Sequence, residues 1–128
     1  MQTINDSLIR DAIEVTLLPG IGSLTQNRLW KALRTISDLF SMDEHSLAAF
    51  GIPGGAFSLI RSRGCQATAS EICDWGRREG CRFLMRGGPG YPPLLEEISD
   101  PPLILYARGQ LEVLEKPCIA VVGTRRPT

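Results

Sequence analysis

The sequence predicts an α+β protein in which an all-helical part precedes the first strands of an α/β sheet. Apolar residues recur at helical spacing through the first 78 residues. Three short apolar runs then follow, bounded by Gly-rich and Pro-rich turns, at 81–85, 103–107 and 118–122. The composition, 43% hydrophobic and 22% charged, is that of an ordinary soluble globular protein. We therefore predict a helical domain over 1–78 and a second domain that begins at 79–128.

The chain opens with a predicted pair of helices joined by a hairpin. Asp6 or Ser7 is the expected cap of the first helix, which ends where Pro and Gly interrupt the pattern in "LLPGIGS". Ser23 and Gln26 have the spacing of a capping box that starts the second helix. This arrangement predicts a helix-hairpin-helix or sterile-alpha-motif-like (SAM-like) domain.

The second helix has an apolar face with Leu29 and Trp30, both expected in the core, and a basic face. Backbone N–H groups in such a hairpin can bind a DNA phosphate, and nearby cations can add counter-charge. The candidate contacts are Gly20, Gly22, Arg28, Lys31 and Arg34. The alternative, which the sequence leaves open, is a hairpin that only packs two helices.

Further short helices complete the predicted helical domain. Ser41 and Glu44 suggest a second capping box, and Gly51 is the expected stop of the helix that follows. Residues 67–78 predict another helix, with Trp75 as a buried side chain.

The three apolar runs are the predicted strands, and the third, 118–122, has the unbroken apolar character of a buried parallel strand. A glycine that ends such a strand lets the backbone approach a phosphate closely. Thr124 adds a hydroxyl, and Arg125 adds a planar fork that can hold a phosphate at two points. The alternative is that Gly123 only ends the strand while Arg125 and Arg126 are solvated. The turn is not G-x-G-x-x-G, so a nicotinamide cofactor is not indicated.

Catalytic and metal-binding residues are scarce in this sequence. His45 is the only histidine, and the four cysteines form no C-x-x-C pair, so we expect no metal site and no cofactor. No nucleophile has an evident base partner, and we expect a protein that is not an enzyme. The N-terminus lacks the pattern of a secretory signal and no stretch has transmembrane length, which predicts a cytoplasmic protein with reduced thiols.

The C-terminal third resembles the entry into the DNA-processing protein A family, DprA, also called Smf. The resemblance rests on Tyr91-Pro92 followed by Leu95, on Pro101-Pro102 before "LILYARG", and on "AVVGTR" at 120–125. It covers 81–128 strongly and the helical part weakly.

The resemblance implies an extended Rossmann-like domain that binds single-stranded DNA, protects incoming DNA and loads the recombinase RecA during natural transformation. It also implies a possible homodimer of the full-length protein. In that family the G-[ST]-R-x-x-[ST] segment contributes to a phosphate pocket, and the matching residues are Gly123, Thr124, Arg125 and Thr128. The later strands, pocket segments and any winged helix of the family are absent, so the expectation is the N-terminal portion of such a protein.

Two alternatives from other classes remain open at this stage. One is a nucleotide-binding Rossmann-type enzyme whose catalytic residues lie beyond residue 128. The other is a helical interaction module with a non-functional tail.

Overall fold

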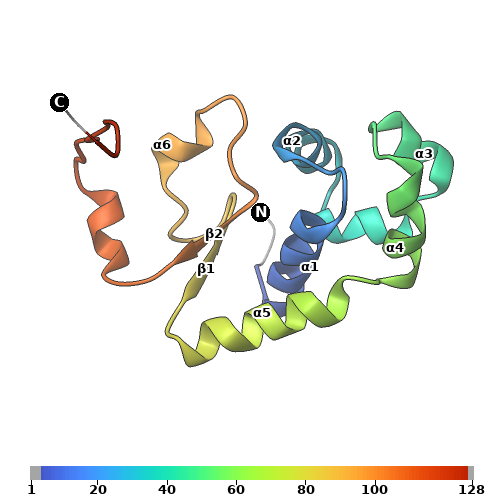
Figure 1. The fold of residues 1–128 in the computed structure, drawn as a ribbon, viewed down its shortest axis with the longest axis horizontal. Helices are drawn as coiled ribbons and strands as arrows, with labels where there is room; N and C mark the ends of the chain where they lie inside the picture. Colours follow the sequence, from blue (N-terminus) through green and yellow to red (C-terminus); the bar gives the residue numbers. More distant parts are fainter. Residues whose placement is uncertain (1–3, 127–128) are drawn as a thin grey trace.

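The computed structural model describes residues 4–126, which form a group of helices, a two-stranded β-hairpin beside it and an extended tail (Figure 1). The helices of the first part are α1 (Asp6–Leu17), α2 (Ser23–Ala32), α3 (Glu44–Ala49), α4 (Phe57–Ser62) and α5 (Gln66–Arg78), with 3₁₀ turns η1 (Ile36–Ser41) and η2 (Gly54–Ala56). The second part contains β1 (Arg82–Met85), α6 (Pro93–Glu96), β2 (Ile104–Ala107) and the 3₁₀ turn η3 (Leu111–Glu115). The predicted all-helical first part and the first two predicted strands are confirmed.

Helix α1 is the central element, because it is buried on several sides. Leu8, Ala12 and Val15 face the core built with α2, α3 and α4, and Ile13 packs on Ala69 and Cys73 of α5. The β-hairpin also contacts α1 and α5. An amphipathic helix that is apolar over much of its circumference is expected at such a position.

The helix caps differ from those that the sequence predicts. Asn5, not Asp6 or Ser7, caps α1 by accepting a hydrogen bond from the Leu8 N–H at 2.9 Å. The N-cap of α2 is Gly22, which has no side chain, so the predicted box of Ser23 and Gln26 is wrong. The box of Ser41 and Glu44 is wrong as well, because α3 begins two residues later than that box requires. Its cap is Asp43, which accepts from the Ser46 N–H at 2.7 Å.

Two further local predictions concern the end of α3 and the burial of Trp75. Gly51 follows α3 with a φ of +77°, the left-handed conformation that favours glycine, and this predicted stop is confirmed. The predicted burial of Trp75 is wrong, because its side chain is 45% exposed on the outer surface of α5. Helical spacing places a residue on a face, but the neighbouring elements decide whether that face is covered.

The two strands pair antiparallel, with Arg82 opposite Ala107 and Met85 opposite Ile104. The expected parallel sheet is therefore not what these strands form. The intervening segment contains only turns and the single-turn helix α6, and a parallel connection needs a longer crossover. The Phe83 and Tyr106 rings stack edge to face across the strands at 5.1 Å, which supports this register.

Met85 and Leu103 of the hairpin region join the main core beside Leu8, Leu29 and Ile36. Residues on both sides of the predicted boundary at residue 78 thus share one apolar cluster. The division into domains at this residue stays a prediction.

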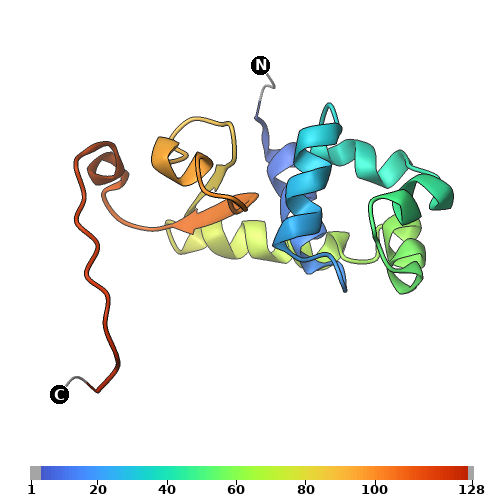
Figure 2. The ribbon, with the colours of Figure 1, turned by 90° about the horizontal axis from the view of Figure 1, so that it is seen from above.

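The predicted third strand is wrong for the described structure. Residues 118–122 form no strand, and Ile119, Val121 and Val122 are each more than nine-tenths exposed. Figure 2 shows the tail running away from the body of the molecule. An unbroken apolar run is typical of a buried strand only where neighbouring strands and helices cover it, and in the described residues none lies beside this one.

Gly76 sets the close approach of α5 to β1, and we predict that Gly76→Ala destabilises the protein. A Cβ at this position would lie 2.4 Å from Cζ of the Phe83 ring. Such overpacking costs about 1–3 kcal/mol, which exceeds the roughly 1 kcal/mol that alanine gains over glycine in a helix. Urea unfolding would measure the difference.

Gly55→Ala is the matched control, because a Cβ there meets nothing within 4 Å. Adding Phe83→Leu to Gly76→Ala should restore part of the loss. A Gly76→Ala variant as stable as the parent would show that β1 can shift without cost.

Candidate nucleic-acid interface

The residues of the predicted phosphate turn lie in the extended tail. Gly123, Thr124 and Arg125 are exposed, whereas Thr128 lies outside the described residues. The tail and the hairpin between α1 and α2 are on opposite sides of the molecule in both views (Figures 1 and 2). The structure therefore does not bring the two candidate groups together.

The hairpin between α1 and α2 is packed at Gly20 and open at Gly22, where a Cβ would meet nothing within 4 Å. Gly20 has a φ of +74°, and a Cβ on it would lie 2.5 Å from Cγ of Pro53. At the N-terminus of α2, the Ser23 hydroxyl donates to the Asp100 carboxylate at 2.9 Å. A carboxylate thus lies where a phosphate would be expected. Phosphate binding by Gly20 and Gly22 stays a prediction, with Asp100 as the competing anion.

The cations predicted near the hairpin divide into two places. Arg28 and Lys31 are exposed on α2. Arg34 lies beyond Ala32, the last residue of α2, and it lines a cavity instead of extending the basic face of the helix.

A buried guanidinium joins the loop after β1 to α2. The sequence analysis did not predict this contact. Arg86, 5% exposed, follows β1 and donates from Nη1 to the Asn27 amide oxygen at 2.6 Å. Its Nε donates to the Glu96 carboxylate at 2.5 Å. Asn27 in turn donates to the Ser99 carbonyl at 3.0 Å. Asn27 was the available sequence signal for this contact. It is a polar residue two positions before Leu29, in a helix that must pack against the core.

The Tyr-Pro and Pro-Pro motifs close the loop that carries α6. The buried Tyr91 hydroxyl donates to the Pro102 carbonyl at 2.7 Å. Burial, with a smaller contribution from the Glu96 charge, raises the pKa of Tyr91, so the phenol stays protonated and can donate this bond. These motif residues therefore hold the loop between β1 and β2 in shape.

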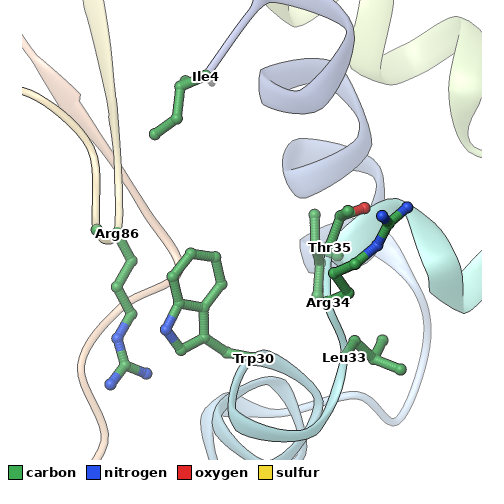
Figure 3. A pocket seen from close by; sticks show the side chains of 8 residues that line it. Ile4, Trp30, Leu33, Arg34, Thr35 and Arg86 are labelled. Carbon is green, nitrogen blue, oxygen red and sulfur yellow. The ribbon is translucent and has the colours of Figure 1, made fainter. Parts of the chain in front are cut away.

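A cavity of about 290 Å³ lies between the end of α2 and the loop after β1 (Figure 3). Its lining residues are Ile4, Trp30, Leu33, Arg34, Thr35, Ile36, Arg86 and Gly87. Trp30, predicted to be a core residue, is only partly buried and forms one wall. The lining combines an indole ring with two cations.

Comparison with known proteins identifies the segment that carries the family signal. Residues 82–128 match the model of the DNA recombination-mediator protein A family. Over 51 residues the chain is 45% identical to Protein Smf of Synechocystis sp., which covers 37% of this chain. Over 53 residues it is 40% identical to DNA processing protein DprA of Bacillus subtilis, which covers 41% of this chain. Residues 82–128 are therefore similar to the DprA/Smf family.

The DprA/Smf match begins at β1, so it contains Arg86, the Tyr91–Pro102 bond and the exposed tail. The aligned segments span 13% and 18% of the two relatives. No solved structure gives a significant match to the chain. The helical part through Arg78 thus lies outside the DprA/Smf family match.

The described residues contain neither a candidate membrane span nor a candidate metal cluster. None of the helices between residues 4 and 126 is long and apolar enough to cross a bilayer. In the same part of the chain, no three His, Cys, Asp or Glu side chains gather in a way that could hold a metal ion.

Proposed function

We propose that this chain acts in a DprA-like protein that binds single-stranded DNA, protects incoming DNA and passes it to RecA during natural transformation. The observation that carries the proposal is the family match over 82–128, which contains the exposed Gly123-Thr124-Arg125 turn. One of the two relatives is a DNA processing protein, which supports the same role.

The proposed architecture adds finer detail to the α+β fold. Residues 79–128 open an extended Rossmann-like domain, and 1–78 form a helix-hairpin-helix or SAM-like domain. The exposed apolar segment 118–122 has β-branched residues and bare backbone groups, so it can pair with further strands of a larger sheet. Pairing would fix the turn at 123–125 at a strand end, where its N–H groups can converge on a phosphate.

The proposed role is binding and transfer without a catalytic step or cofactor. RecA and a second copy of the full-length protein are the proposed protein partners. The cytoplasm, where DNA and RecA meet, is the proposed location.

We predict that Arg125→Ala weakens binding of a labelled single-stranded oligonucleotide at least about tenfold, the equivalent of one charged hydrogen bond. Arg125→Lys keeps the charge but loses the two-pronged geometry, so it should recover only part of the affinity. Mixed and homopolymeric sequences should weaken alike, because a phosphate contact carries no base information. Fluorescence anisotropy at low salt would measure this on the full-length protein, in which further strands would pair with 118–122.

The neighbouring Arg126→Ala is the matched control, because Arg126 lies next to Arg125 and outside the motif position. It should cost less than Arg125→Ala. Equal small losses for the two variants would leave Arg125 as a solvated residue and remove the phosphate turn from the proposal.

A further inference from the structure

The cavity beside α2 has the shape and lining of a site for one planar group. Its volume of about 290 Å³ lies at the lower end of the range for small-molecule sites. Figure 3 shows the Trp30 ring as one wall, with Ile4 above it and Thr35, Arg34 and Leu33 on the opposite side. The cavity opens to solvent, because Arg34 is exposed and Trp30 is only partly buried.

The loop after β1 holds the Trp30 ring in place. A Cβ on Gly87, whose φ is +70°, would lie 3.0 Å from Cζ2 of the indole, so the loop after β1 passes close to the ring. The Arg86 guanidinium lies 5.7 Å from the ring centroid and is itself held by Asn27 and Glu96. A ring supported in this way offers a flat surface at little cost in side-chain entropy.

The charges around the cavity favour an anion. Arg34 and Arg86 line it, and none of the other lining residues is acidic. Glu96 neutralises Arg86, whereas no carboxylate of the described residues lies within ion-pair distance of Arg34. Lys31 is exposed on the adjoining end of α2 and adds a second cation outside the cavity.

Thr35 lines the same space, and its hydroxyl points away from Trp30 (Figure 3). Its Oγ1 accepts from the Ser37 N–H at 3.1 Å, which fixes the hydroxyl while leaving its hydrogen to donate. The lining therefore combines an aromatic ring with an exposed cation at the rim.

We propose that this cavity holds one base of single-stranded DNA, stacked on Trp30, with the adjoining phosphate at Arg34. Aromatic stacking is tolerant of base identity, and a cation beside the ring tracks the backbone. The inference rests on the proposed function only in that the chain meets single-stranded DNA. It places a second contact in the helical part, away from Arg125.

The fluorescence of Trp30 tests the proposal directly. In a Trp75→Phe chain, which leaves Trp30 as the single tryptophan, we expect an oligothymidylate to quench the emission. An oligonucleotide of equal length without bases should quench less than a fifth as much at equal concentration, because it offers phosphates and no stacking partner. In a Trp30→Phe chain, whose emission comes from the exposed Trp75, the oligothymidylate should change the signal little.

Affinity measurements complete the test. Trp30→Leu should weaken binding of the oligothymidylate at least about fivefold, whereas Trp30→Phe keeps a ring and should lose less. Trp75→Leu, on the exposed face of α5, is the matched control and should change nothing. Circular dichroism would confirm that each variant is folded.

Unquenched Trp30 emission up to millimolar oligothymidylate would overturn the proposal, whether or not the chain binds DNA elsewhere. Equal quenching by the oligonucleotide without bases would overturn it as well. The two DNA contacts remain distinguishable, because Arg125→Ala should leave the quenching of Trp30 in place. Quenching with no effect of Arg125→Ala would count against the phosphate turn alone.

Discussion

Replacement of Arg63 by methionine is expected to destabilise the protein by about 3–5 kcal/mol, the usual cost of leaving a buried charge without its partner. Arg63 donates from Nε and Nη2 to the Glu14 carboxylate at 3.0 and 2.7 Å, and from Nη2 to Asp11. The Glu14 side chain is completely buried on α1, and Asp11 is nearly so. Without the guanidinium, two carboxylates would face each other in the core.

Several contacts make this arginine difficult to replace. Its guanidinium stacks on the Phe40 ring at 3.7 Å from the centroid. Burial, the largest single influence, lowers its pKa, but hydrogen bonds and charges from Glu14 and Asp11 together raise the pKa above its usual value. Arg63 also ends α4 in the left-handed conformation, with φ +55°, and methionine faces the same backbone cost. The expected loss of stability therefore measures the contacts of the Arg63 side chain and not a change in backbone strain.

Arg61→Met is the matched control, because Arg61 lies on the same helix and pairs with Glu44 at an exposed site. It should cost less than about 1 kcal/mol, as surface ion pairs usually do. Adding Glu14→Gln and Asp11→Asn to Arg63→Met should recover part of the stability. Urea unfolding curves that show similar losses for Arg61→Met and Arg63→Met would contradict the buried-network account.

Arg86→Met should cost about 2–3 kcal/mol, since hydrogen bonds to charged groups contribute about 1.5–3 kcal/mol and their partners would be left unpaired. The change leaves the Asn27 amide oxygen and the Glu96 carboxylate without the hydrogen bonds that Arg86 donates. It also removes a link between α2 and the loop after β1. We therefore expect faster hydrogen exchange at Leu84 and Met85 in addition to the lower urea midpoint.

Arg108→Met is the control for Arg86→Met. Arg108 and Glu79 form an exposed pair at 3.8 Å, and its loss should be nearly neutral. If exchange at β1 stays unchanged in Arg86→Met, apolar packing holds the hairpin to the helices without help from Arg86.

Local patterns in the sequence predict the elements well. The helical spacing and the apolar runs at 81–85 and 103–107 lie within one or two residues of α5, β1 and β2. These predictions succeed because periodicity and turn residues are local properties. The antiparallel pairing does not follow in the same way, since it depends on which strands are present to be neighbours.

The misjudged residues all depend on distant contacts. The segment 118–122 has the composition of a buried strand, but burial requires partners that the described residues do not supply. Ser23 has the spacing of a capping box, yet its hydroxyl is bound by Asp100 from the far end of the chain. Trp30 has core spacing and borders a cavity, because the loop after β1 approaches without closing over it. No single-sequence pattern reports such contacts.

The position of Leu103 in the main core has a consequence for the order of events during protein synthesis. Leu8 and Leu29 leave the ribosome early, but the apolar cluster that they share with Leu103 cannot close until β2 has followed. At elongation rates of roughly 5–20 residues per second, that delay is on the order of 5 to 20 seconds. Throughout it, part of the apolar surface of α1 and α2 stays uncovered, so we expect the nascent chain to bind chaperones that recognise exposed apolar segments.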